Sequence, residues 1–232
     1  MKKLSTLISY PFLILRSLPF NLIHLPLKQA IKVPIILHKF HMVSMKGKII
    51  IDTDNVYCGM IHLGAYCSKV FPNDGLTWDQ RGGTVIFKGK ARIGNHCFVV
   101  VGRKSTVIFG DDFLVNAGFK LASFFGISFG QSTRFGWDCL VMDSNMHPLY
   151  DIEKQKFKRA SGPIEIGDYN WFATKCRIMH SVKTPERCIF GMNTTVTRNA
   201  EMQSYCVMGG EPVRILTRNV MRIIGQDQED LG

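Results

Sequence analysis

An apolar residue recurs at every sixth position through the second half of the chain. Only one of the eight positions is polar, and the series is Ile166, Phe172, Ile178, Thr184, Phe190, Val196, Met202 and Met208. A fixed short period is typical of a solenoid, in which each repeat stacks on the one before it. Because a period of six does not keep one face apolar at 3.6 residues per turn, the pattern excludes an α-helix and predicts short stacked strands.

Shorter series with the same period precede the long one. They are Phe87, Ile93 and Val99, then Phe109, Val115 and Leu121, then Phe129, Phe135, Val141 and His147. Glycine followed by Asp, Asn or another polar residue recurs just after these positions, which suits sharp corners between strands. We therefore expect the solenoid to be regular from about Gly82 onward, with extended pieces in residues 46–81 at its start.

The residue four places after each apolar position is usually small. Five of the seven cysteines occupy this slot, namely Cys97, Cys139, Cys176, Cys188 and Cys206. Cysteine packs there as a small hydrophobic residue, so we expect free thiols in a reducing compartment. The chain has no CxxC motif, and its histidines lack the HxH or HxxxH spacing of metal ligands, so no metal is expected.

The rhythm is interrupted between His147 and Ile166. The interval holds a polar run and two prolines, and we expect residues 148–162 to project from the coil as a loop. Binding residues are often carried by such excursions from a rigid scaffold, although a solvated loop without a role is the plain alternative. His147 stands where the series calls for an aliphatic residue, which makes it a candidate for chemistry, with a structural histidine that caps the last strand as the alternative.

Residues 1–45 differ from the rest of the chain. The first 51 residues hold eight Lys or Arg and no Asp or Glu, out of a net charge of +11 for the whole chain. Prolines and charges interrupt every apolar run, so short helical pieces are expected rather than a transmembrane helix or a cleaved signal peptide. Two interpretations remain open: a helical cap on the solenoid, and contact with an anionic membrane surface. The basic residues are diluted among apolar ones, which favours lipid over nucleic acid as a partner.

Three segments resemble the hexapeptide-repeat acyltransferases, in the galactoside, maltose and polysaccharide O-acetyltransferase branch. They are residues 161–171, 190–198 and 207–214, and in this order and spacing they extend the resemblance over about Gly82 to Arg218. The resemblance implies an all-β fold, a left-handed parallel β-helix, to which the head adds a short helical segment. The expected division is residues 1–45 as the head, 46–218 as the β-helix, and 219–232 as a tail.

The same resemblance implies roles for individual residues. Members of the family are homotrimers that bind acetyl-CoA in a groove and use a histidine as base, and His147-Pro148 matches that histidine and its proline. Asn116 matches an asparagine of the acceptor pocket. The positions that match coenzyme contacts are Ala173, Thr174, Met192, Arg198 and Arg214. Met192 and Arg198 depart from the usual small residue and lysine of the family.

Acyl transfer to a hydroxyl needs a base whose pKa lies near neutral, and histidine suits this task. Asp143, four residues before His147, is a candidate to orient the imidazole, with a turn-forming role as the alternative. Backbone N–H groups or the Asn116 amide are candidates to stabilise the oxyanion. Trp171 either stacks on the coenzyme or packs against another subunit, and Arg198 and Arg214 either pair with phosphates or are merely solvated.

These observations together predict an enzyme that transfers acetyl from acetyl-CoA to a sugar hydroxyl, by direct attack, in surface polysaccharide biosynthesis. The acceptor is expected to be a saccharide or a lipid-linked saccharide, and the enzyme to be cytoplasmic, at the inner face of the membrane. An N-acyltransferase acting on an amino sugar and a non-catalytic β-helix scaffold are the alternatives.

Overall fold

Three parallel sheets wind into one triangular coil. The structure, a computed structural model, describes residues 2–224. Sheet A has nine strands, which are β1 (Ile35–Leu37), β4 (Ile61–Ala65), β7 (Ala91–Gly94), β10 (Phe113–Val115), β13 (Arg134–Phe135), β18 (Trp171–Phe172), β20 (Ile189–Phe190), β22 (Cys206–Gly209) and β23 (Arg214–Arg218). All neighbours in sheet A pair in parallel except the last two, β22 and β23.

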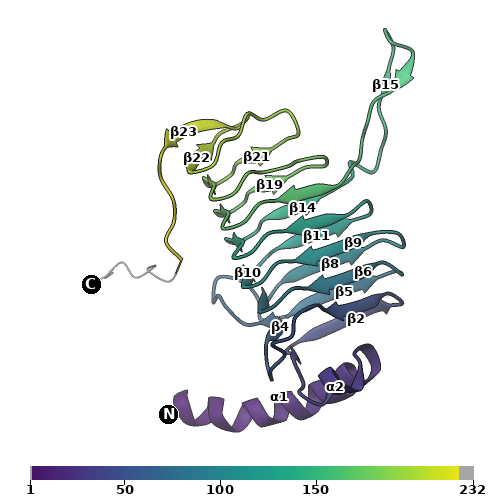
Figure 1. The fold of residues 1–232 in the computed structure, drawn as a ribbon, viewed down its shortest axis with the longest axis vertical. Coiled ribbons are helices and arrows are strands. Elements are labelled where there is room, and N and C mark those ends of the chain that lie inside the picture. Colours follow the sequence, from purple (N-terminus) through teal and green to yellow (C-terminus); the bar gives the residue numbers. More distant parts are fainter. Residues whose placement is uncertain (1, 225–232) are drawn as a thin grey trace.

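The other two sheets form the remaining sides of the triangle. Sheet B consists of β2 (Phe40–Met45), β5 (Leu76–Gln80), β8 (Cys97–Val101), β11 (Lys120–Ser123), β14 (Leu140–Met142), β19 (Arg177–Ile178) and β21 (Thr195–Val196). Sheet C consists of β3 (Lys48–Ile51), β6 (Thr84–Phe87), β9 (Thr106–Phe109), β12 (Ile127–Phe129) and β17 (Ile164–Ile166). Because the chain visits A, B and C in turn, we name the corners AB, BC and CA by the sheets that they join (Figure 1).

The predicted six-residue series fills the core. The ring pairs Phe87–Phe109, Phe109–Phe129, Phe135–Phe172 and Phe172–Phe190 are stacked at centroid distances of 4.4–5.6 Å. The five cysteines of the small slot are buried and unpaired, as expected. Identical positions of successive coils therefore pack on one another along the axis, which is why the period is visible in the sequence.

The first coil begins earlier than the expected boundary. Strands β1 and β2 lie within residues 1–45, which the sequence assigned to the helical head. Ile35 and Ile36 are fully buried and β1 pairs with β4, so this segment belongs to the β-helix. The first two coils are longer than the regular ones because the chain inserts loops at residues 52–60 and 66–75, and these insertions hide the six-residue period.

The head forms one long helix where shorter pieces were expected. Helix α1 (Lys2–His24) contains Pro11 and Pro19, and the short α2 (Leu27–Ala30) follows it. Helix α1 lies across the open end of the coil (Figure 1). The Asn21 side chain donates to the Ile35 carbonyl at 2.8 Å and accepts from the Ile35 N–H at 3.0 Å, and the Ser17 hydroxyl accepts from the Leu37 N–H at 2.9 Å. These bonds satisfy the free edge of β1, so the predicted cap is present.

The predicted loop leaves the coil at the BC corner and carries a small hairpin of β15 (Tyr150–Asp151) and β16 (Lys156–Phe157). It projects far from the coil (Figure 1). Ser144 pairs with Ser161 at its base, and β17 then resumes sheet C with Ile164 opposite Ile127. His147 is therefore an exposed residue of the loop and not a buried position of the coil, so its place in the six-residue series was misread.

Among the described residues, no helix has both the length and the hydropathy needed to cross a membrane.

Candidate functional site

A cleft of about 470 Å³ runs along the AB corner and the adjoining outer face of sheet A. It is built by β10, β13 and β18 and by the turns that follow them and β20. The residues that line it are Leu114, Asn116, Arg134, Phe135, Gly136, Trp137, Trp171, Ala173, Thr174, Met192 and Arg222. Its size is typical of small-molecule sites, which span about 300–1,000 Å³. The cleft thus brings together five of the residues selected from the sequence: Asn116, Trp171, Ala173, Thr174 and Met192.

The cleft has a fixed floor. Gly136 allows the next coil to approach, because a Cβ at this position would lie 2.8 Å from the Thr174 nitrogen. Arg134 is 8% exposed and donates to both the carboxylate and the carbonyl of Asp112. Burial opposes ionisation of Asp112, but the bonds and charge of Arg134, with Lys90, outweigh it and lower the pKa of Asp112. The ion pair holds the Arg134 guanidinium against the wall, so its place is set before any ligand arrives.

A second cavity of about 440 Å³ continues from the first. The two cavities share Leu114 and Asn116, and the second is otherwise lined by Tyr66, Cys67, Ser68, Lys69 and Arg92. Four of these residues come from the insertion at 66–75, and Arg92 donates to the Tyr66 carbonyl at 3.3 Å. Asn116 therefore stands at the junction of two compartments. Each has two cationic side chains and no carboxylate among its lining residues, Arg134 and Arg222 in the first and Lys69 and Arg92 in the second.

The C-terminal tail supplies part of the cleft wall. The Arg222 guanidinium carbon lies 4.5 Å from the centroid of the Trp171 ring. Upstream of it, the Val220 N–H donates to the Tyr205 carbonyl at 2.9 Å, and Arg187 contacts the Met221 sulfur. Sequence reasoning missed Arg222, as it did Lys69 and Arg92, because no periodic signal predicts where a tail or an insertion folds back.

The BC corner holds the candidate base. His147 is exposed at the foot of the loop, and its backbone N–H donates to the Asn145 carbonyl at 2.7 Å. Asp143 is fully buried and accepts bonds of 2.8–2.9 Å from the N–H groups of residues 124–126 and from the Ser123 hydroxyl. This is the turn-forming role set out as the alternative. Between the described residues, no bond joins Asp143 to the His147 ring, so the orienting role stays a prediction.

Arg198 and Arg214 lie apart from the cleft. Arg198 occupies the BC corner and donates to the Arg159 carbonyl of the loop at 3.4 Å. His180 lies on the same corner, where burial and then the charges of Arg198 and Arg159 lower its pKa. Arg214 is an exposed residue at the start of β23, paired with Gly209. Within one chain the predicted site residues therefore fall on two different corners, apart from Arg214.

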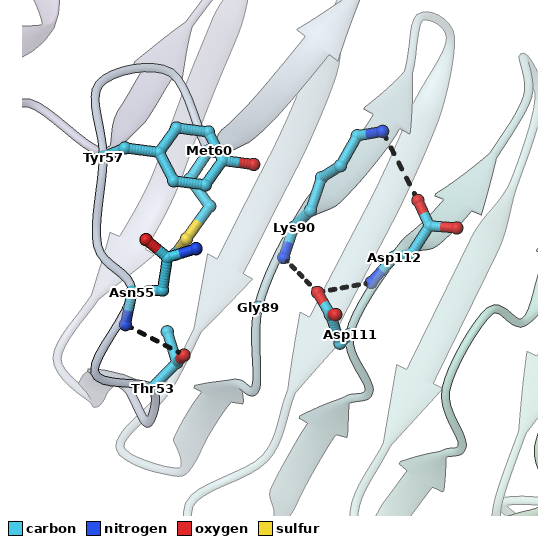
Figure 2. A pocket seen from close by; sticks show the side chains of 8 residues that line it. All are labelled: Thr53, Asn55, Tyr57, Met60, Gly89, Lys90, Asp111 and Asp112. Atoms are coloured by element: carbon cyan, nitrogen blue, oxygen red, sulfur yellow. Dashed lines mark hydrogen bonds and ion pairs between the residues drawn. The ribbon is translucent and has the colours of Figure 1, made fainter.

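The CA corner carries a further cavity, of about 310 Å³, which contains none of the predicted site residues. Figure 2 shows the Lys90 ammonium pointing to Asp112 and the Asp111 carboxylate held by two backbone N–H groups, those of Lys90 and Asp112. Both carboxylates are thus engaged in holding the corner. Asp112 also pairs with Arg134, which lines the AB cleft, so the CA corner helps to fix one wall of that cleft.

No family model matches the chain. The polysialic acid O-acetyltransferase of Escherichia coli O1:K1 / APEC is 27% identical over 124 residues, which is 53% of this chain and 40% of that protein. The solved structure of the polySia-specific acetyltransferase NeuO superposes with a TM-score of 0.60 at 20% identity, covering 84% of this chain and 86% of that one.

The chain has the hexapeptide-repeat β-helix fold. The predicted left-handed β-helix and the predicted family resemblance are thereby confirmed. The chain spans less than half the length of the curated relative it matches. The head was the part of the sequence that the resemblance left unexplained, and here it caps that coil.

Proposed function

We propose that the protein is an acetyl-CoA-dependent O-acetyltransferase that acts on a saccharide hydroxyl. The observation that carries the proposal is the junction of two cavities at Asn116. The larger one is lined by three residues that match coenzyme contacts, Ala173, Thr174 and Met192, so the acetyl-CoA thioester would end near Asn116. The smaller one offers a hydroxyl acceptor a compartment beside it. The curated relative, named for O-acetyl transfer to polysialic acid, supports this assignment.

The charges of the smaller cavity favour an acidic sugar. Lys69 and Arg92 line it, and a guanidinium binds a carboxylate in a planar, two-bonded geometry. A neutral sugar would leave both cations without a charge partner in the acceptor. We therefore assign a carboxylated saccharide of a surface polysaccharide, or its lipid-linked precursor, as the acceptor class.

The proposed reaction is direct attack. The neutral His147 imidazole accepts the proton of the sugar hydroxyl while the hydroxyl oxygen bonds to the thioester carbonyl carbon. The carbonyl becomes an oxyanion, and the Asn116 amide is placed to donate to it. The C–S bond then breaks, the carbonyl re-forms on the ester product, and the imidazolium returns the proton to the CoA thiolate. The proposal includes no acyl-enzyme: the five cysteines of the coil are buried packing residues, and the Cys67 thiol of the smaller cavity donates to the Asn95 side-chain oxygen at 3.3 Å.

The placement of these residues on two corners supports a homotrimer. The cleft lies at the AB corner, whereas His147 and Arg198 lie at the BC corner of the same chain. A ring of identical subunits uses two different patches of each chain at every interface, so the AB corner of one subunit meets the BC corner of the next. In this arrangement His147 and Arg198 of each subunit complete the cleft of its neighbour.

Calorimetry with acetyl-CoA and mass spectrometry of the acceptor test the proposal. We expect binding that is lost in Thr174→Trp, which fills the cleft, and acetylation of polysialic acid in preference to a neutral glucan. Absence of coenzyme binding by the wild type would contradict the proposal and favour the scaffold alternative. Acetylation confined to amino groups of amino sugars would favour the N-acyltransferase alternative.

A further inference from the structure

Helix α1 has an inner face that packs on the first coil and an outer face that is apolar and uncovered. Its inner face presents Ser17, Phe20 and Asn21 to the first coil, and these are 0–7% exposed. The opposite face presents Phe12, Leu15 and Ile23, which are 67%, 68% and 75% exposed. Leu22 lies on the same face. Phe12 and Leu15 are three residues apart, and Leu22 and Ile23 follow Leu15 after seven and eight residues, that is, after about two turns of the helix. An apolar stripe on the outside of a capping helix has no role in holding the cap.

The stripe continues beyond the helix. Leu27 at the start of α2 and Ile31 directly after it are 69% and 64% exposed. Scattered single hydrophobic residues are normal on a protein surface, but six large ones within twenty residues of the head mark an interaction surface. We call Phe12, Leu15, Leu22, Ile23, Leu27 and Ile31 the outer stripe.

Cations border the outer stripe, and the head itself contains no acid. Arg16, Lys28 and Lys32 are exposed beside it, and the first 51 residues contain no Asp or Glu. A second copy of this chain would bring its own basic head against this one, so like charges would face each other. An anionic bilayer offers the opposite charge together with an apolar interior for the stripe.

We propose that the outer stripe docks the protein in the plane of an anionic lipid membrane. Aromatic and aliphatic side chains of the stripe enter the acyl boundary, while Arg16 and Lys28 pair with lipid phosphates. This inference stands on the head alone and does not require acyl transfer. It also bears on the acceptor: Asn116 follows β10, three coils above β1, and at ~4.8 Å per coil the junction lies about 14 Å along the axis from β1. Helix α1, about 10 Å wide, separates β1 from the lipid, so the junction stands about 25 Å from the membrane and a lipid-linked saccharide would reach it with its sugars.

Vesicle sedimentation tests the proposal on the full chain. Phosphatidylcholine vesicles with added phosphatidylglycerol are compared with phosphatidylcholine alone, using wild type and the triple variant Phe12→Ser/Leu15→Ser/Ile23→Ser. A matched control, Leu149→Ser/Ile152→Ser/Phe157→Ser, removes three equally exposed apolar side chains from the hairpin. Thermal unfolding of each variant checks that the cap remains folded.

We expect wild type and the hairpin control to sediment with the anionic vesicles and the head variant to bind at least about tenfold more weakly. Arg16→Gln/Lys28→Gln should weaken binding and reduce its salt dependence. Vesicle binding by a folded head variant equal to that of wild type would overturn the proposal. Self-association of wild type that the head variant abolishes, without vesicle binding, would overturn it in favour of a second copy.

Discussion

Arg222, ten residues from the C-terminus, stacks on Trp171 of β18, with the guanidinium carbon 4.5 Å from the ring centroid. Both residues line the AB cleft, although 51 positions separate them in the chain. The contact fixes the tail against the coil and adds a positive charge to the mouth of the cleft. An anionic ligand with several phosphates, such as a coenzyme A, gains from a cation in this position.

Replacing Arg222 with Ala is therefore expected to weaken acetyl-CoA binding by about 1 kcal/mol, a factor of roughly five, with a smaller difference at high salt. Isothermal titration calorimetry measures this directly. Lys48→Ala removes one positive charge from an exposed site of β3 in sheet C, in the first coil and outside both cavities, and should leave the affinity unchanged. Equal affinities of Arg222→Ala and Lys48→Ala would show that the tail does not contribute to the coenzyme site.

The turn-forming and the orienting role of Asp143 can be separated by substitution. Three backbone N–H groups and the Ser123 hydroxyl lose their buried acceptor in Asp143→Ala, so we expect the free energy of unfolding to fall by about 2–4 kcal/mol. Asp168→Ala removes an exposed carboxylate that accepts from the Gln131 N–H, and should cost less than about 1 kcal/mol. Denaturant titration compares the two. A stable Asp143→Asn with a hundredfold lower kcat would instead support the orienting role.

Subunit complementation tests the shared site. His147→Ala lacks the base and Thr174→Trp has a blocked cleft, so each alone is expected to be inactive. In trimers formed from an equal mixture, one site in four pairs an intact His147 corner with an intact cleft, so up to about a quarter of the wild-type activity should return. If the mixture is as inactive as the two single variants, His147 and the cleft that it serves belong to the same chain.

The pair of His38 and His62 predicts a pH dependence of stability. The two rings meet at 2.9 Å, and burial, with the neighbouring charges of His62 and Arg92, lowers the pKa of His38 to about 4. The unfolded chain takes up this proton near its ordinary pKa of about 6.5, whereas the folded chain resists it. Stability from His38 is therefore complete above about pH 6.5 and is lost as the pH falls toward 4.

Urea unfolding between pH 7 and pH 4.5 measures this loss. We expect the free energy of unfolding to fall with decreasing pH, and to fall less steeply in His38→Gln, which has no imidazole to protonate. If the free energy of unfolding of the variant falls with pH as steeply as that of the wild type, other groups account for the loss of stability at low pH.

The regular part of the fold could be predicted because each coil repeats the same packing. Phe172 and Phe190 are three periods of six apart, which is one full turn of the coil, and their rings therefore stack with their centroids 4.4 Å apart. The cysteines were predictable too, since their slot admits only small side chains. The start of the coil at Ile35 could not be predicted, because insertions of unequal length separate the first coils and destroy the period.

The candidate site was predicted only in part. Trp171, Thr174 and Asn116 sit on regular coils, so the periodicity places them on one corner. Lys69 and Arg222 reach the site from an insertion and a tail, whose paths depend on tertiary contacts and not on local pattern. One of the two grounds for selecting His147 was incorrect, because the series was continued past Ser144, where the chain leaves the coil. The other, its match with Pro148 to the histidine and proline of the family, stays a prediction.

The central claim is that His147 acts as the base in acetyl transfer. The most direct measurement is kcat for acetylation of the acceptor by His147→Ala, together with the acetyl-CoA affinity of the same variant by calorimetry. If His147 is the base, kcat falls by at least about a hundredfold while the affinity stays within about twofold of wild type. A variant that binds acetyl-CoA normally and retains the wild-type kcat would contradict it.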